Sequence, residues 1–146
     1  IIVFYRGGWC PYCNKQLAGL QKIEEELKSM GYQIIAVSPD NIEFLGKTAR
    51  KKDLSYKLLS DANAEAAQQF GIAFQLDDKT VKKYRTYGIN LEKRSGGENM
   101  SNILPVPAVF ILDQEGRIKF EYINPNYEER LEPELLLFAA ELALEK

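Results

Sequence analysis

Short apolar runs and helical patterns alternate along this chain, and their order restricts the fold that it can adopt. The opening run Ile1–Tyr5 is rich in β-branched and aromatic residues, which is typical of a buried strand. From Pro11 to Met30 apolar residues recur at helical spacing, and Gly31 can end that helix. We expect further strands over residues 33–38, 56–59, 106–112 and 117–123, and helices over residues 40–52, 62–70, 78–87 and 132–145. This alternation predicts an α/β fold with a parallel core, helices on both faces and an antiparallel hairpin at the edge.

Several of the predicted helices carry recognisable ends. Ser38 and Pro39 offer an N-cap and a first-turn proline for the helix over residues 40–52, and Asp61 can cap the next helix. The last helix has Pro133 in its first turn and is apolar on most sides, which predicts burial in the core or, alternatively, at a subunit contact. Residues 73–105 are less regular and are interpreted as a contact surface or as a lid over the loop after the first strand.

Composition excludes several kinds of chemistry. The chain has 146 residues, two cysteines, no histidine and a formal net charge of -2. Without histidine there is no Ser-His-Asp or Cys-His apparatus, and two candidate ligands are too few for a structural zinc site. The balanced charge argues against a nucleic-acid binder, and no apolar stretch approaches the ~20 residues of a membrane span. The length fits one domain over residues 1–146, and any leader or earlier strand is expected upstream of Ile1, which leaves the compartment open.

Cys10 and Cys13 form a C-x-x-C sequence at the junction of the first strand and the first helix. This spacing at such a junction indicates a redox pair. Unpaired N–H groups and the dipole at a helix N-terminus lower the pKa of a thiol and so favour the reactive thiolate. Pro11 is compatible with the first turn, because its missing N–H would have no partner there. We predict that Cys10 is the exposed nucleophile and Cys13 the deeper, resolving thiol, with Arg6 near enough to stabilise a thiolate.

Other interpretations of this segment stay open. The cysteines could be buried structural residues, because cysteine is often fully buried, or metal ligands, although the other ligands are missing. Trp9 and Tyr12 are candidates for substrate contact, with simple packing as the alternative for each. No cofactor is expected.

Matching segments of a known pattern extend over nearly the whole chain. They are Phe4–Asn14 (Phe-Tyr-Arg-Gly-Gly-Trp-Cys-Pro-Tyr-Cys-Asn), Ile35–Pro39, Leu59–Asp61, Phe70–Ile72, Tyr84–Arg85, Gly88–Ile89, Leu104–Asp113, Asn124–Tyr127, Arg130 and Pro133. This pattern closely resembles that of the peroxiredoxin-like redoxins, the AhpC/TSA group of the thioredoxin-fold superfamily. The resemblance implies a thioredoxin-like three-layer α/β/α fold with a mixed sheet, in which the first strand or strands of the family are missing at the N-terminus.

The resemblance to true peroxiredoxins is incomplete at the reactive centre. Their signature Pro-x-x-x-Thr-x-x-Cys places the peroxidatic cysteine at Cys13 and replaces the threonine with Cys10. The arginine that precedes a later strand in that family is replaced by Pro107. Two of the three peroxide-binding groups are therefore absent, which argues against efficient peroxide reduction.

The resemblance to thioredoxins has its own departures. Pro107 resembles the cis-proline that faces the C-x-x-C sequence there, so we expect a cis Val106–Pro107 bond whose backbone groups bind substrate. An ordinary trans proline, or a cis bond at Pro105, is the alternative. The buried acid of thioredoxins is replaced by Phe4, so proton transfer would use water, the backbone or a more distant acid.

Glu24 and Asp40 are the candidates for that acid, and we expect weaker activation of Cys13 than in a thioredoxin.

The sequence leaves three possible functions. The first is a thiol–disulfide oxidoreductase with Cys10 as nucleophile, the second a thiol-dependent peroxidase with Cys13 peroxidatic and Cys10 resolving, and the third a redox-inert binding domain. The first is favoured by the placed C-x-x-C sequence with Pro107. The expected partners are a protein or small-molecule disulfide or hydroperoxide and a thiol electron donor such as thioredoxin or glutathione, with no nucleic acid and no membrane span.

Overall fold

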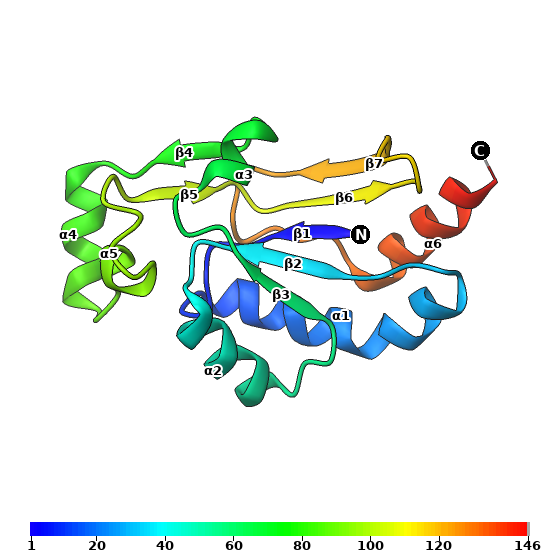
Figure 1. Ribbon diagram of the computed structural model, residues 1–146, viewed down its shortest axis with the longest axis horizontal. Coiled ribbons are helices and arrows are strands. Elements are labelled where there is room, and N and C mark those ends of the chain that lie inside the picture. The colour runs from blue at the N-terminus through cyan, green and yellow to red at the C-terminus, as the bar shows by residue number, and fades with distance from the viewer. Residues whose placement is uncertain (146) are drawn as a thin grey trace.

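A five-stranded mixed sheet forms the centre of the computed structural model, which describes residues 1–145 (Figure 1). β1, β2 and β3 run parallel, whereas β6 is antiparallel to both β1 and β7. The spatial order is β3-β2-β1-β6-β7, with bounds β1 (Ile2–Phe4), β2 (Ile35–Ser38), β3 (Lys57–Ser60), β6 (Ala108–Leu112) and β7 (Ile118–Ile123). The predicted α/β fold is confirmed, but only β7 of the predicted hairpin lies at the edge of the sheet.

Three helices cover one face of the sheet: α1 (Pro11–Ser29), α2 (Ile42–Lys52) and α6 (Pro133–Leu144). Leu17 and Leu27 of α1 are fully buried in one cluster with Val3 of β1 and Val109 of β6. The helical spacing of apolar residues on α1 therefore matches the face that it presents to the sheet.

The last helix is buried on one side only. On α6, Leu136 and Ala140 are 1% and 0% exposed, whereas Leu135 and Phe138 are 57% and 59% exposed. The prediction of burial in the core is thus right for the side that packs alongside α1 and wrong for the other side, whereas the alternative of a subunit contact stays a prediction.

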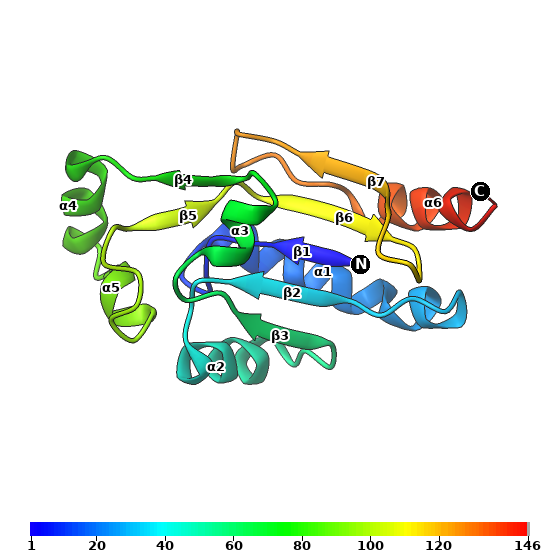
Figure 2. The same ribbon diagram turned by 45° about the horizontal axis from the view of Figure 1, so that its top comes forward.

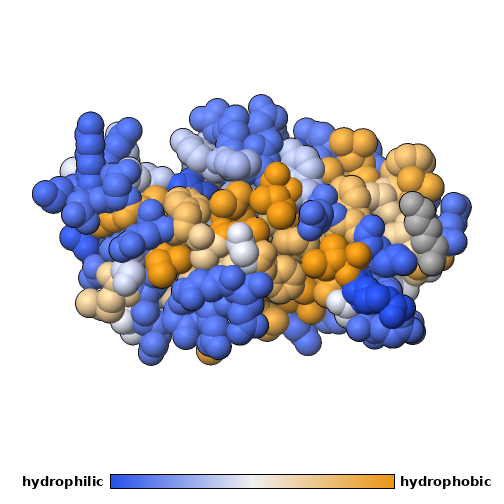
Figure 3. Space-filling model, turned by 90° about the horizontal axis from the view of Figure 1, so that it is seen from above, coloured by the Kyte–Doolittle hydropathy of each residue, from blue (hydrophilic) through white to orange (hydrophobic). Residues whose placement is uncertain are grey.

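The opposite face of the sheet carries a smaller apolar cluster around Phe4. Its ring centroid lies 5.1 Å from that of Phe70 and 6.1 Å from that of Phe110, and the residues of α3 (Glu65–Gln69) pack over this cluster. Helices therefore lie on both faces, as predicted. Because α3 has only five residues, Leu59 stays 44% exposed on this face, and Figure 3 shows hydrophobic residues at the surface on this side.

Residues 73–105 form an arm at one end of the sheet. In it β4 (Ala73–Gln75) pairs antiparallel with β5 (Ile103–Pro105), and α4 (Asp78–Thr86) and α5 (Leu91–Arg94) follow β4 in the chain. Both ribbon views place α4 and α5 at the end of the molecule where α1 begins (Figures 1 and 2). The helix predicted over residues 78–87 is confirmed, whereas the two strands were missed because three residues leave little recognisable pattern.

The start of α2 differs from the prediction. Ser38 does not cap this helix, because the pairing of β2 with β3 extends through Ser38. The helix begins at Ile42, and the Asn41 side chain accepts a hydrogen bond from the Phe44 N–H at 3.1 Å. Asn41 is therefore the N-cap.

No helix within residues 1–145 combines the length and the apolar character that crossing a membrane requires.

Candidate functional site

The redox loop, residues Tyr5–Trp9, joins β1 to α1 and depends on two glycines. A Cβ on Gly7 would lie 2.3 Å from Nε1 of Trp9, and a Cβ on Gly8 would lie 2.1 Å from Oγ1 of Thr48. Neither gap can hold a methyl group. The paired glycines therefore let the loop fold back under the tryptophan and pack against α2.

Both cysteines lie where this loop enters α1. Cys10 is the N-cap residue with an extended backbone, Pro11 is the first helical residue, and Cys13 follows within the first turn. Both are free thiols, with exposures of 1% and 0%. The predicted placement at a helix N-terminus is confirmed, whereas the prediction that Cys10 is exposed is wrong.

Cys10 is the sulfur that carries negative charge most readily. Its pKa falls from 9.0 to about 5, chiefly because the Cys13 side chain donates a hydrogen bond to it. Burial opposes this shift, while the Cys13 backbone N–H and the charges of Arg6 and Arg130 favour it. This is the behaviour predicted for the first cysteine of the pair.

Cys13 behaves in the opposite way. Burial raises the pKa of its thiol well above the ordinary value, and the neighbouring Cys10 raises it further. Two donors nevertheless converge on its sulfur: the Arg6 backbone N–H at 3.4 Å and Nη2 of Arg130 at 3.3 Å. These are the groups that would stabilise a thiolate on Cys13 during reaction.

Arg130 matches the family pattern, but its position beside the cysteines was not predicted from the sequence. Its Nη2 lies 3.9 Å from the Cys10 sulfur as well as 3.3 Å from the Cys13 sulfur. Nη1 donates to Oε1 of Gln16 at 2.8 Å, and Nε donates to the Tyr127 carbonyl at 2.8 Å. The available signal was that match, together with an arginine just before the last helix, whose Pro133 packs near Gly19 of α1.

Arg6 is close to the cysteines, but its guanidinium contacts aromatic rings. It lies 4.8 Å from the centroid of Trp9 and 4.4 Å from that of Tyr127, and it donates a hydrogen bond to the Tyr84 hydroxyl. Its charge still favours the Cys10 thiolate. The side chain therefore acts on the sulfurs through space, while its backbone N–H contacts Cys13 directly.

The two predicted aromatic contacts lie on different sides of this cluster. The Trp9 ring packs 5.3 Å from that of Tyr84, on α4 of the arm. Tyr12 is 39% exposed and lies 5.8 Å from the ring of Tyr127. Of the two, Tyr12 is the more exposed, and Trp9 is partly buried.

The predicted cis bond at Val106–Pro107 is wrong, since every peptide bond within residues 1–145 is trans, including that before Pro105. The backbone groups expected to bind substrate also have partners. The Val106 N–H donates to the Ile72 carbonyl at 2.7 Å, and the Pro107 carbonyl accepts from Asn124 at 3.4 Å. These bonds hold the extended connection from β5 to β6.

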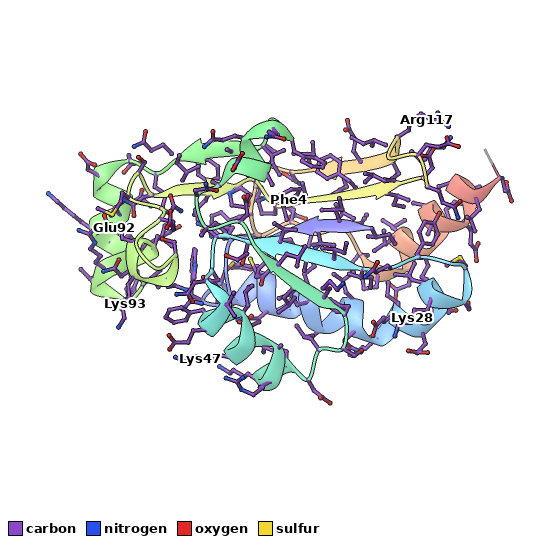
Figure 4. All side chains as sticks on the ribbon, in the orientation of Figure 1. Phe4, Lys28, Lys47, Glu92, Lys93 and Arg117 are labelled. Atoms are coloured by element: carbon purple, nitrogen blue, oxygen red, sulfur yellow. The ribbon has the colours of Figure 1, made fainter. Side chains whose placement is uncertain are left out.

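Both predicted acids have other hydrogen-bond partners in the structure. Glu24 bonds to Ser55 and to Lys28, which Figure 4 shows toward the far end of α1. Asp40 accepts from Nε and Nη2 of Arg94, each at 2.8 Å, and from the Gly8 N–H at 2.8 Å. Asp40 therefore anchors the redox loop to the arm.

A groove with a volume of about 570 Å³ borders the site. It is formed by α1 and by residues 128–134, and Tyr12, Gln16 and Arg130 are among its lining residues. Lys15 and Lys22 line the same groove as four glutamates, so its charge is mixed. Within residues 1–145, no group of three or more potential metal ligands comes together.

The fold and the paired thiols define a thioredoxin-like α/β protein with a dithiol at a helix N-terminus. The chain belongs to the AhpC/TSA family, whose profile matches residues 1–121.

Named relatives and solved structures agree with this. Peroxiredoxin Bcp of Escherichia coli is 35% identical over 72 residues, which cover 49% of this chain and 46% of that protein. The chain thus matches about half the length of this relative. The thiol-disulfide oxidoreductase ResA of Bacillus anthracis is 23% identical over 133 residues, covering 90% of this chain and 59% of that protein. A Xanthomonas campestris bacterioferritin comigratory protein, described for its alkyl peroxide reduction activity, superposes with a TM-score of 0.72 at 15% identity, covering 97% of this chain and 76% of that chain.

Proposed function

We propose that this chain is a thiol-dependent peroxidase in which Cys13 reduces a hydroperoxide and Cys10 then closes a disulfide with it. The observation that carries the proposal is the setting of Cys13. Its sulfur is 0% exposed, and it accepts from the Arg6 N–H and from Arg130. Such a site favours a small oxidant over a bulky protein disulfide and offers donors to the charge on the reacting atoms. Family membership and the similarity to peroxiredoxin Bcp support it.

The proposed reaction balances in two steps. The Cys13 thiolate attacks the terminal peroxide oxygen, so that a sulfur–oxygen bond forms, the oxygen–oxygen bond breaks and the alcohol leaves after taking up a proton. Cys10 then attacks the resulting sulfenic acid, a disulfide forms and water leaves. One hydroperoxide is reduced and two thiols are oxidised. An external thiol such as thioredoxin or glutathione would restore the dithiol.

The hydrogen bond between the two thiols allows the reactive Cys13 thiolate to form by a single proton transfer. In the resting pair the charge lies on Cys10 and the proton on Cys13. Transfer of that proton to Cys10 places the charge on Cys13, where two donors already point. No histidine or free carboxylate is needed.

A second function is favoured by the lowered pKa of Cys10. A thiol with a pKa of about 5 is largely thiolate at neutral pH and would attack a disulfide directly. The similarity to ResA over most of the chain points the same way. In this alternative Cys10 is the nucleophile and Cys13 resolves the mixed disulfide.

Single-cysteine variants separate the two functions. Reduced wild-type protein, Cys10→Ser and Cys13→Ser are mixed with hydrogen peroxide and, separately, with insulin as a disulfide substrate. For the peroxidase, Cys13→Ser should lose rapid peroxide consumption, and Cys10→Ser should stop at a sulfenic acid that dimedone traps.

The other outcomes are equally distinct. Trapping of insulin on Cys10 in the Cys13→Ser variant, with slow peroxide consumption by the wild type, would establish the exchange function instead. If neither substrate reacts and the cysteines never form a disulfide, the redox-inert binding function is correct.

A further inference from the structure

We propose that Arg130, held in place by Gln16, sets the balance between the dithiol and the disulfide of the Cys10–Cys13 pair. This deepens the proposed function, because it rests on the pair cycling between those two states. It holds for a peroxidase and for an exchange enzyme alike.

The geometry gives Arg130 contact with both reacting atoms. Its Nη2 lies 3.3 Å from the sulfur of Cys13 and 3.9 Å from that of Cys10. One guanidinium N–H group therefore faces the charge whichever sulfur carries it. Arginine keeps its charge at every working pH, so this contact persists through the cycle.

Gln16 restricts where that guanidinium can go. Its Oε1 accepts from Nη1 of Arg130 at 2.8 Å, while the Tyr127 carbonyl accepts from Nε at 2.8 Å. Gln16 lies on α1, within the same helix as Cys13. The arginine is thus anchored from two elements, and Gln16 acts as a positioning residue through Arg130.

The resemblance to peroxiredoxins implies that the arginine before the strand corresponding to β6 is replaced in this chain by Pro107. Pro107 has no side-chain charge, and the structure places the guanidinium of Arg130, from the segment before α6, beside the sulfurs instead. Other charged or titratable groups around the pair include Arg6, Tyr5 and Tyr12, and Tyr12 in turn lies near Glu128 and Tyr127. The charge of Arg6 also favours the Cys10 thiolate, but its guanidinium contacts aromatic rings, whereas that of Arg130 contacts the sulfurs themselves.

The direction of the effect follows from charge. The dithiol state carries a thiolate, whereas the disulfide is neutral. A guanidinium beside the sulfurs stabilises only the charged state, so it favours the dithiol and makes the disulfide more oxidising. Removal of the guanidinium should shift the equilibrium toward the disulfide.

The main test is the oxidation equilibrium in glutathione redox buffers. Wild-type protein is compared with Arg130→Gln, Arg130→Lys and Gln16→Leu, and with Arg50→Gln as the matched control. Arg50 is an exposed arginine on α2, away from the pair. Arg130→Gln should favour the disulfide about tenfold, equivalent to about 30 mV. Arg130→Lys should keep part of the effect, Gln16→Leu should shift in the same direction by less, and Arg50→Gln should match wild type.

A second readout measures the same interaction without any oxidant. Thiolate absorbance in the ultraviolet is followed against pH for each reduced variant. The pKa of Cys10 should rise in Arg130→Gln by about 1, matching the tenfold equilibrium shift. Circular dichroism of each variant checks that it is folded.

Equal equilibrium constants and equal titrations for folded Arg130→Gln and wild type would overturn the proposal. If folded Gln16→Leu keeps the wild-type equilibrium constant, the positioning role of Gln16 is wrong. Because neither measurement uses a hydroperoxide, failure of the peroxidase assay leaves this test intact, and the two proposals fail separately.

Discussion

Cys10 and Cys13 are the same residue type three positions apart, yet the pKa of Cys10 is lowered and that of Cys13 is raised. The hydrogen bond from the Cys13 side chain, the Cys13 backbone N–H and the charges of Arg6 and Arg130 favour the Cys10 thiolate. Cys13 lies one turn deeper, where burial outweighs the donors around it. The opposite shifts of the two pKa values therefore arise within a single turn of helix.

The reduced protein should titrate in two well-separated steps. One thiolate should form near pH 5, and the second should form only well above pH 9, the ordinary value for a thiol. Because the pKa of Cys10 is lowered on folding, its thiolate stabilises the fold fully only above the ordinary thiol pKa of 9.0, and this contribution decreases as pH falls and is lost below about 5. Ultraviolet thiolate absorbance of wild type and Cys10→Ser measures the steps. A single step of two thiols near pH 9 in wild type would contradict the prediction.

At the residue scale, the sequence predicted the local part of the site. Cys10, Pro11 and Cys13 are positioned by a strand, a glycine pair and a helix start that are adjacent in the chain. The sequence pattern was therefore sufficient to predict where they lie. Arg130 meets the sulfurs only after α6 packs alongside α1, a tertiary contact across 117 residues that no local pattern reports. The prediction of a cis Val106–Pro107 bond was wrong for a related reason. The backbone of Val106 is held by the Ile72 carbonyl, which is distant in the sequence.

The elements themselves were predicted where they are long. α1, with 19 residues, shows several repeats of its apolar spacing, whereas β4 and β5, with three residues each, show none. The boundary error at α2 has a specific cause. Serine is a favourable N-cap residue, but Ser38 pairs with β3 in the sheet. The N-cap of α2 is therefore Asn41.

Replacement of Asn41 by alanine should therefore weaken the start of α2. The Asn41 side chain accepts from the Phe44 N–H, and its loss leaves that donor to water. We expect the free energy of unfolding in urea to fall by about 1 kcal/mol. Asn63→Ala, at an exposed turn before α3, is the comparison. An Asn41→Ala variant as stable as wild type would show that the cap is dispensable.

At the scale of the whole molecule, two apolar clusters lie on the two faces of one sheet. β1 belongs to both, because Val3 points to one face and Phe4 to the other. The arm is joined to this body by the Asp40–Arg94 pair and by the contact of Arg6 with Tyr84. We propose on these grounds that residues 1–146 form a single domain.

A single domain should unfold in one step. Trp9 is the only tryptophan of the chain and lies between the redox loop and the arm, so its fluorescence reports on their contact. Fluorescence and far-ultraviolet circular dichroism should give coincident urea transitions. A fluorescence transition that precedes the loss of helix would mean that the arm detaches independently.

The position of Arg130 also affects where the chain can be cut. The family profile ends at residue 121, after both cysteines and before the segment that contains Arg130 and α6. A protein shortened to that boundary would keep every residue that the family profile matches. It would nevertheless lose the guanidinium beside the sulfurs and the apolar cover of α1, so motif content alone is a poor guide to a functional fragment of this chain.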